Sequence, residues 1–171
     1  MTTVATPPPS GAVPDVAALA AQLAGKYMTF QLADEVYALE ILKVREIIGL
    51  MEITRVPRAS ACVRGVINLR GKVIPVVDLR LRFGMEACQA TDQTVIIVVQ
   101  CAIAGRDVTM GILVDQVLEV LSIEAGQIEP PPALAETAAE AQFVLGVGKA
   151  NDRVVFLLDV ARVLGDHAAA A

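Results

Sequence analysis

The alternation of hydrophobic and polar residues changes near residue 26. Before this point, Leu19 and Leu23 stand at helical spacing and Asp15 is a candidate N-cap, which predicts a short helix over residues 16–24. After it, the period becomes two, which is typical of β-strands. The first half offers five strands, at residues 27–32, 36–41, 44–51, 66–69 and 73–77. Five short strands suit a small barrel, because closure removes exposed strand edges.

The second half repeats this organisation. Its five predicted strands lie at residues 94–102, 107–114, 117–121, 143–148 and 153–158. Residues 123–142 are rich in Pro, Glu and Ala and are predicted to form a long loop. Further short helices are expected after Asp78, at residues 160–164, and as one turn at residues 60–64. The proline-rich residues 1–14 are expected to be disordered.

The most informative segment is residues 64–84. Two β-rich runs flank Arg70-Gly71-Lys72, which predicts a hairpin in which Gly71 supplies the positive φ of a short turn. Asp78 then ends the second strand and can cap a short helix, which Gly84 can end.

The chain also carries a degraded internal duplication. A shift of 81 residues places Gly65 on Gly146 and Asp78 on Asp159, and a shift of 73 places Glu46 on Glu119. Chance similarity between β-rich runs is the alternative, but the matched endings occur in the same order in both halves. The repeat predicts two small domains, with barrels at residues 26–92 and 93–167, a tail and short helix at 1–25, and a tail at 168–171.

Composition narrows the functional classes. The net charge is −5 overall, yet residues 26–92 carry ten Lys/Arg against eight Asp/Glu, whereas residues 93–171 carry four against ten. A negative chain with 4% aromatic residues is a poor candidate for nucleic-acid binding. No uncharged apolar run reaches the roughly 18–20 residues of a membrane span, and the N-terminus does not read as a signal peptide. We therefore expect a cytoplasmic protein without direct membrane insertion.

Candidate catalytic and metal-binding groups are scarce. The single histidine, His167, lies in an alanine-rich tail, and Cys62, Cys88 and Cys101 show no metal-ligand spacing. We interpret the cysteines as buried or half-buried free thiols. No phosphate-binding glycine loop precedes a helix, so we expect neither enzymatic activity nor a cofactor.

These motifs resemble the CheW family of bacterial chemotaxis coupling proteins. The resemblance rests first on Gly-Val-Ile-Asn-Leu-Arg-Gly at residues 65–71 and Val-Ile-Pro-Val-Val-Asp-Leu at residues 73–79. It extends to residues 44–48, 53–57, 111–115, 117–120, 128–132 and 157–159, and so covers roughly residues 26–165. Residues 1–25 fall outside the family's pattern.

The resemblance implies a mainly β fold of two tandem SH3-like five-stranded β-barrels. It also implies an adaptor without catalytic activity, which bridges the cytoplasmic tips of transmembrane chemoreceptors and the regulatory domain of the histidine kinase CheA. In the family, receptors bind the groove between the barrels and the kinase contacts are barrel to barrel. The family's interaction residues carry over to Val44, Glu46, Gly65 and Arg70, and the protein would be recruited to membrane-associated receptor arrays.

Each of these four residues also has a structural interpretation. Arg70 could be a solvated turn residue, but its counterpart Asn151 shows that the fold does not require a cation there, which favours a contact role. Glu46 is shared by both copies and could be structural, with Arg70 as one possible partner. Val44 is most simply a core residue, and Gly65 most simply a backbone requirement.

Two other functions remain open at this stage. The first is a sensor that binds a small ligand between its halves, which a deep apolar pocket with convergent polar groups would favour. The second is an excised regulatory domain of a kinase or of a receiver-fused coupling protein. The initial Met and the loose tail after Asp166 favour a complete protein over this second alternative.

Overall fold

The computed structural model describes residues 16–86, 88–103, 105–130 and 143–168, and in these segments the chain is mainly β. Three helices accompany the strands: α1 (Val16–Leu23), α2 (Leu79–Arg82) and α3 (Val160–Ala168). Two 3₁₀ turns are also present, η1 (Ile41–Lys43) and η2 (Ala125–Gln127). The predicted disorder of residues 1–14 and the predicted cap Asp15 lie outside the described residues.

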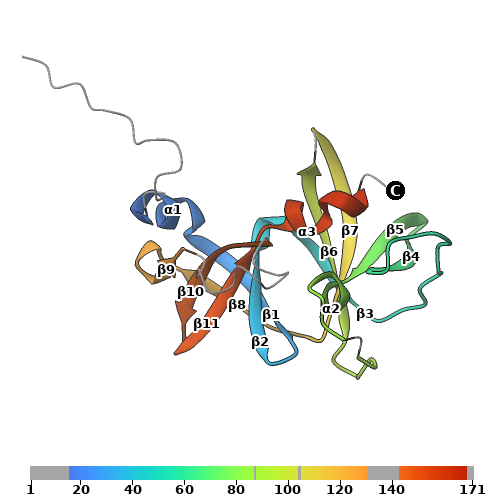
Figure 1. The fold of residues 1–171 in the computed structure, drawn as a ribbon, viewed down its shortest axis with the longest axis horizontal. Coiled ribbons are helices and arrows are strands. Elements are labelled where there is room, and N and C mark those ends of the chain that lie inside the picture. Colours follow the sequence, from blue (N-terminus) through green and yellow to red (C-terminus); the bar gives the residue numbers. More distant parts are fainter. Residues whose placement is uncertain (1–15, 87, 104, 131–142, 169–171) are drawn as a thin grey trace, which may run out of the picture.

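The strands form two sheets, which Figure 1 shows on the left and right of the molecule. The six-stranded sheet has the order β8 (Gln116–Ile123), β1 (Gly25–Leu32), β2 (Glu35–Glu40), β11 (Arg153–Leu158), β10 (Val144–Ala150), β9 (Ile128–Glu129). The five-stranded sheet has the order β3 (Val44–Gly49), β6 (Val95–Ile103), β7 (Arg106–Val114), β5 (Lys72–Asp78), β4 (Val63–Leu69). We call these the six-stranded and the five-stranded barrel.

The division of strands between the barrels differs from the expected boundary at residues 92 and 93. The five-stranded barrel is the contiguous stretch from β3 to β7, whereas the six-stranded barrel combines β1 and β2 with β8 to β11. The two copies of the repeat therefore exchange their first two strands, and β2 and β11 pair in parallel, as do β5 and β7. The connections explain this, because the single residue Asp115 between β7 and β8 is too short for a hairpin and the chain crosses to the other barrel.

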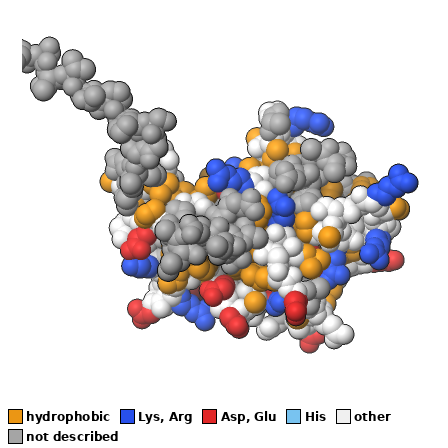
Figure 2. Space-filling model, viewed as in Figure 1, with side chains coloured by type: hydrophobic (Ala, Val, Ile, Leu, Met, Phe, Trp, Pro, Cys, Tyr) orange, Lys and Arg blue, Asp and Glu red, His pale blue; other side chains and the backbone are white. Residues whose placement is uncertain are grey.

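The exchange sharpens the charge asymmetry. Residues 44–114 carry nine Lys/Arg and six Asp/Glu, a net charge of +3, so the rest of the chain carries −8. Figure 2 shows basic side chains along the right-hand edge of its face, over the five-stranded barrel. The fold thus separates charge between its barrels more strongly than the two halves of the sequence do.

The hairpins and caps follow the predictions closely. Leu69 pairs with Lys72, so Arg70 and Gly71 form a two-residue turn with φ of 52° and 81°. Asp78 caps α2, with its carboxylate accepting hydrogen bonds from the amides of Arg80 and Leu81. Gly84 follows the helix at φ 78°.

Three predictions of local structure need correction. Residues 60–64 form no helical turn, because Ala61 and Cys62 make a tight turn and β4 already begins at Val63. The loop predicted at residues 123–142 contains the end of β8, then η2 and β9, and its residues 131–142 lie outside the described residues. Helix α3 continues past the expected end at residue 164 to Ala168.

The largest hydrophobic cluster lies between the barrels. Phe30 and Tyr37 from the six-stranded barrel meet Phe83, which follows α2, and Tyr37 lies 5.3 Å from Phe83 between ring centroids. Phe83 in turn stacks on Phe143 at 5.5 Å. Smaller clusters fill each barrel. Because the main core belongs to both barrels, they pack as a unit.

Candidate partner-binding surface

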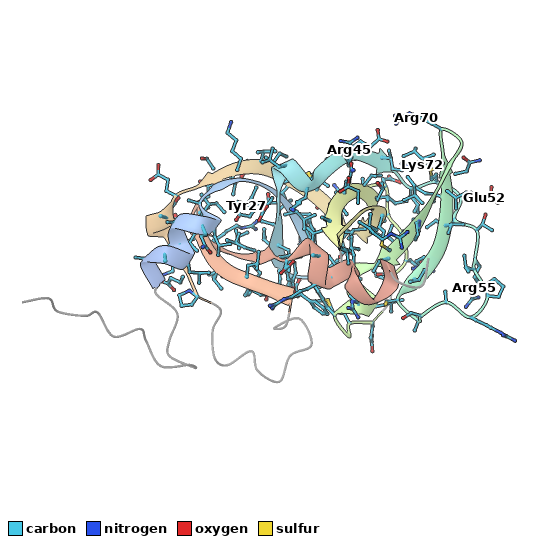
Figure 3. All side chains as sticks on the ribbon, turned by 90° about the horizontal axis from the view of Figure 1, so that it is seen from above. Tyr27, Arg45, Glu52, Arg55, Arg70 and Lys72 are labelled. Carbon is cyan, nitrogen blue, oxygen red and sulfur yellow. The ribbon has the colours of Figure 1, made fainter. Side chains whose placement is uncertain are left out.

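Arg70 and Glu46 form a forked ion pair at the tip of the β4–β5 hairpin. Two guanidinium nitrogens of Arg70 each donate a hydrogen bond of 2.9 Å to a different carboxylate oxygen of Glu46. Hydrogen bonding and the carboxylate charge both raise the pKa of Arg70. Figure 3 shows Arg70 at the outer end of this hairpin. The pairing of these two residues, considered from the sequence, is confirmed.

This ion pair also joins two edge strands. In the described sheet order, β3 and β4 stand at opposite ends of the five-stranded barrel. Arg70 follows β4 and Glu46 lies on β3, so their contact spans the open side of the barrel. The side chain of Arg70 is 75% exposed and that of Glu46 26% exposed. A partner can therefore reach the pair from solvent.

The six-stranded barrel contains an equivalent but weaker contact. Asn151, the counterpart of Arg70, donates a 3.3 Å hydrogen bond to Glu119, the counterpart of Glu46. Asn151 and Asp152 form the two-residue turn of the β10–β11 hairpin, with φ of 51° and 60°. The duplication has kept the geometry of the site and changed its charge.

The backbone at Arg70 adopts a conformation that is more favourable for asparagine, the residue type of its counterpart Asn151, than for arginine. A φ of 52° lies in the left-handed region, where Asn is several-fold enriched and most other side chains are uncommon. Asn68 supports this turn through its side-chain oxygen, which accepts a 2.9 Å hydrogen bond from the amide of Gly71. The turn thus holds an arginine where the local backbone favours Gly or Asn.

Gly65 serves the backbone, as expected. It is buried at a β-bulge opposite Val76 and Val77, with φ of 148°. A Cβ here would overlap the carbonyl oxygen of Thr54. Thr54 exchanges two 2.8 Å backbone hydrogen bonds with Val66. Gly65 therefore allows the connection after β3 to lie against β4.

Val44 is half-buried and packs against the cluster between the barrels. This agrees with its interpretation as a core residue. Along β3, half-buried and exposed positions alternate, so Glu46 shares the more buried set with Val44, while Arg45 and Ile47 are exposed. Of the four predicted site residues, Glu46 and Arg70 contact each other, and Val44 and Gly65 support the strands that carry them.

Two exposed apolar residues close in sequence to the ion pair were missed by the sequence analysis. Ile47 follows Glu46 and is 44% exposed, and Val73 lies just after the hairpin turn and is 66% exposed. Their counterparts in the other copy, Val120 and Val154, are also exposed. The sequence did offer one signal, because the duplication matches these β-branched residues with β-branched residues in the other copy. The exposed basic residues Arg45 on β3 and Lys72 on β5, both labelled in Figure 3, add positive charge to the same strands.

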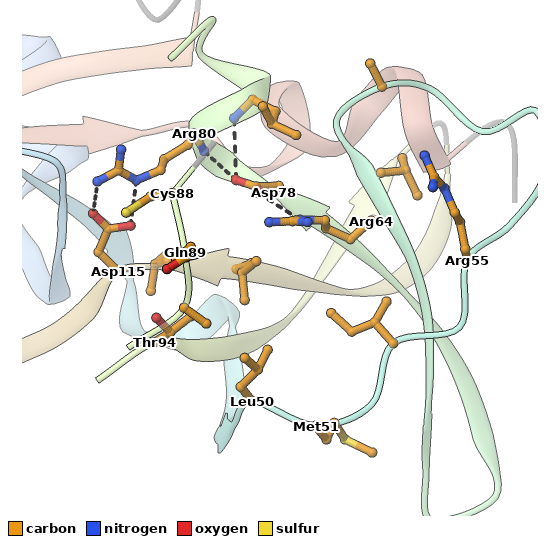
Figure 4. A pocket seen from close by; sticks show the side chains of 17 residues that line it. Leu50, Met51, Arg55, Arg64, Asp78, Arg80, Cys88, Gln89, Thr94 and Asp115 are labelled. Atoms are coloured by element: carbon orange, nitrogen blue, oxygen red, sulfur yellow. Dashed lines mark hydrogen bonds and ion pairs between the residues drawn. The ribbon is translucent and has the colours of Figure 1, made fainter. Parts of the chain in front are cut away.

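A hollow of about 800 Å³ lies at the other end of the five-stranded barrel (Figure 4). Leu50, Met51 and Val63 contribute to its apolar lining. Its volume is within the range of small-ligand pockets. Four of its five charged groups form two ion pairs, Arg80 with Asp115 and Arg64 with Asp78, and Arg55 is the fifth. The four paired groups bind one another, which does not favour the small-ligand alternative.

Cys62 and Cys101 are buried free thiols, and burial raises the pKa of Cys101. Cys88 is exposed, so the expectation of burial is wrong there, because it lies in the connection between α2 and β6. Within the described segments no group of three or more His, Cys, Asp or Glu could hold a metal ion. The side chain of His167 lies outside the described residues.

Among the described residues, no helix has both the length and the apolar character needed to cross a membrane. The longest described helix, α3, has nine residues.

Comparison with known proteins gives a consistent result. The CheW-like domain family matches residues 26–168. The chain is 37% identical to the chemotaxis protein CheW of Klebsiella aerogenes over 153 residues, 89% of each chain. It is 36% identical to that of Helicobacter pylori, covering 81% of each chain, and 38% identical to that of Rhizobium meliloti, covering 78% of this chain and 83% of the relative.

A solved structure is similar as well. The crystal structure of the scaffolding protein TtCheW from Thermoanaerobacter tengcongensis matches with a TM-score of 0.70 and 38% identity, over 80% of this chain and 90% of that one. The resemblance first seen in residues 65–79 is thus confirmed along most of the sequence. The chain belongs to the CheW family of chemotaxis proteins.

Proposed function

We propose that this protein is an adaptor that couples the cytoplasmic tip of a transmembrane chemoreceptor to the regulatory domain of the histidine kinase CheA. It acts by protein–protein binding and carries out no chemical step. Membership of the CheW family supports the adaptor role. In this proposal the protein is cytoplasmic and is recruited to membrane-associated receptor arrays.

The observation that carries the proposal is the conformation of Arg70. A left-handed backbone at a bulky residue is unfavourable, and such positions persist where function needs them. The equivalent turn of the other copy has Asn151 at this position, so folding alone does not require arginine. We therefore assign Arg70 to partner contact rather than to the turn.

The Arg70–Glu46 pair is the proposed contact unit. Glu46 orients the guanidinium through both oxygens, so Arg70 is presented to a partner in a fixed direction. Arginine is enriched among the residues that contribute most to binding at protein interfaces. Gly65 and Val44 have supporting roles, because they fix β4 and β3.

The direct test is reconstitution with a receptor cytoplasmic fragment and the CheA regulatory domain. Calorimetry measures each pairwise affinity, and kinase assays on the ternary complex measure activation. The proposal requires that the wild-type protein bind both partners and change kinase output when receptor is present. Absence of binding to either partner by the folded protein would refute it.

A further inference from the structure

Helix α2 lies at the junction of the two barrels although it has only four residues. It follows β5 of the five-stranded barrel directly, and its first residue, Leu79, is fully buried in the cluster between the barrels. Its two arginines, Arg80 and Arg82, both bind groups outside the five-stranded sheet. A helix this short cannot be stable alone, so its contacts with the barrels hold it in place.

Arg80 reaches the crossover between the barrels. Its Nε donates a 2.8 Å hydrogen bond to Oδ1 of Asp115, and its Nη2 donates one of 2.5 Å to Oδ2 (Figure 4). Asp115 is the single residue between β7 and β8, where the chain passes from the five-stranded to the six-stranded barrel. The side chains are 19% and 29% exposed, so the pair is largely shielded from solvent.

The same carboxylate also holds the six-stranded barrel. Oδ2 of Asp115 accepts a 2.8 Å hydrogen bond from the amide of Ala33. Ala33 lies in the turn between β1 and β2, with a left-handed φ of 56°. Burial alone would raise the pKa of Asp115, but the hydrogen bonds from Arg80 and Ala33 outweigh it and lower that pKa. One side chain therefore joins α2, the crossover and a turn of the other barrel.

Arg82 makes a second connection of this kind. Its Nε donates a 3.0 Å hydrogen bond to the carbonyl oxygen of Val163 in α3, which follows β11 of the six-stranded barrel. Its guanidinium lies 4.6 Å from the ring centroid of Phe143. By contrast, the other crossover, η1 between β2 and β3, leaves Leu42 91% exposed. Arg80 and Arg82 thus connect α2 to the crossover at Asp115 and to α3.

We propose that α2 is a clamp between the barrels, in which Arg80 acts through Asp115 and Ala33 to fix the angle between them. Arg80 and Asp115 are positioning residues in this device. Because binding is stronger to a preorganised surface, a partner that contacts both barrels would be sensitive to the clamp, whereas a partner that contacts one barrel would not.

The test does not depend on the proposed function. Residual dipolar couplings of backbone amides, measured in weakly aligned protein, report whether two bodies share one orientation. We expect the couplings of both barrels to fit one alignment tensor in the wild type. In Arg80→Gln, in Asp115→Ala and in the double variant, we expect the two barrels to need different tensors. Each barrel's internal couplings should still fit its own wild-type coordinates.

Arg64→Gln is the matched control. It removes an Arg–Asp ion pair that lines the same hollow, but Arg64 and Asp78 both belong to the β4–β5 hairpin. Both barrels should still fit one tensor in this variant. A single tensor in the Arg80 and Asp115 variants, equal to that of the control, would overturn the proposal.

Amide hydrogen exchange of Ala33 provides a second measurement, which reports this one contact directly. In the wild type this amide should be protected by the Asp115 carboxylate. We expect exchange at least about tenfold faster in Asp115→Ala, because a hydrogen bond to a charged group is lost. In the milder variant Arg80→Lys, the exchange rate of the Ala33 amide should lie between those of the wild type and Asp115→Ala. Unchanged protection of Ala33 in Asp115→Ala would show that the contact does not hold the turn, and would contradict the clamp.

Discussion

Arg70 binds Glu46 across the open side of the five-stranded barrel, through two hydrogen bonds of 2.9 Å. The geometry is that of a forked arginine–carboxylate pair, which fixes direction as well as distance. Its counterpart, the contact between Asn151 and Glu119, spans the other barrel with one hydrogen bond of 3.3 Å. The same chain therefore contains a reference contact in which a neutral amide takes the place of the guanidinium.

The first prediction concerns Arg70→Ala. Arg70 is exposed, and alanine would have to adopt the same left-handed turn conformation as arginine. We therefore expect the Tm to change by no more than about 2 °C. Binding of receptor fragment and kinase regulatory domain should weaken at least about tenfold, as for an interface arginine. Calorimetry and kinase assays measure these effects.

Arg153→Ala is the control for this prediction. Arg153 begins β11 just after the equivalent hairpin turn and is exposed. It should change neither the Tm nor the affinity. A large loss of stability in Arg70→Ala would mean that the residue is structural. If the Arg70→Ala variant binds its partners as tightly as the wild type, the site assignment is wrong.

The second prediction uses the internal reference directly. Arg70→Asn places the residue of the second copy into the turn of the first. Because Asn adopts the left-handed region more readily than Arg, we expect the Tm to remain equal or to rise. Partner binding should nevertheless weaken as in Arg70→Ala. A fall of several degrees in Tm would instead mean that the main role of the ion pair is to stabilise the fold.

The third prediction separates Gly65 from the contact residues. Gly65→Ala would place a methyl group against the Thr54 carbonyl, at a φ that L-residues rarely adopt. We expect a loss of roughly 2–4 kcal/mol in the free energy of unfolding, measured by denaturant titration. Gly126→Ala is the control, because a Cβ at that position would have no neighbouring atom within 4 Å. Equal stability of the two variants would refute the backbone role of Gly65.

The sequence predicted local structure well because local structure depends on nearby residues. Strand positions followed the two-residue period, and the turn at Gly71 and the cap at Asp78 followed from residue type. The pairing partners of the strands were not predictable in this way. Side-chain alternation determines which face is buried, but the exchange of β1 and β2 depends on connections as short as Asp115.

The candidate site was predictable only in part for the same reason. Glu46 and Arg70 were identified through their motifs, and their contact was one of the considered possibilities. Arg80 and Asp115 are 35 positions apart and belong to no shared sequence pattern, so only the folded chain brings them together. Exposure of Ile47 and Val73 was likewise hidden, because β-branched residues in strands are more often buried.

The fourth prediction is a loss of stability at high pH through Tyr27. Its hydroxyl donates to the carbonyl oxygen of Leu23, and burial, together with the charge of Glu40, raises its pKa to about 12. A raised pKa in the folded state means that stability is fully present below the ordinary value of 10.0 and falls as pH rises towards the folded value. We expect stability to decline between these values in the wild type and less in Tyr27→Phe. Denaturant titrations at several pH values provide the measurement, and an identical decline in both proteins would exclude this origin.

The fifth prediction concerns α1, which precedes the part of the chain that matches the CheW-like domain family. Ala20 and Leu23 are buried in the cluster inside the six-stranded barrel, and the Leu23 side chain occupies the space that a Cβ at Gly146 would need. Helix α1 packs on η2 and β9 (Figure 1), so it covers one end of that barrel. This makes α1 part of the core although it stands outside the family's shared pattern.

Leu23→Ala should therefore destabilise the protein by about 2–4 kcal/mol, through lost burial and a residual cavity. Gln22→Ala, at the neighbouring exposed position of the same helix, keeps helix propensity and should be close to neutral. Thermal and denaturant unfolding measure both variants. If Leu23→Ala is as stable as Gln22→Ala, α1 is not docked in solution.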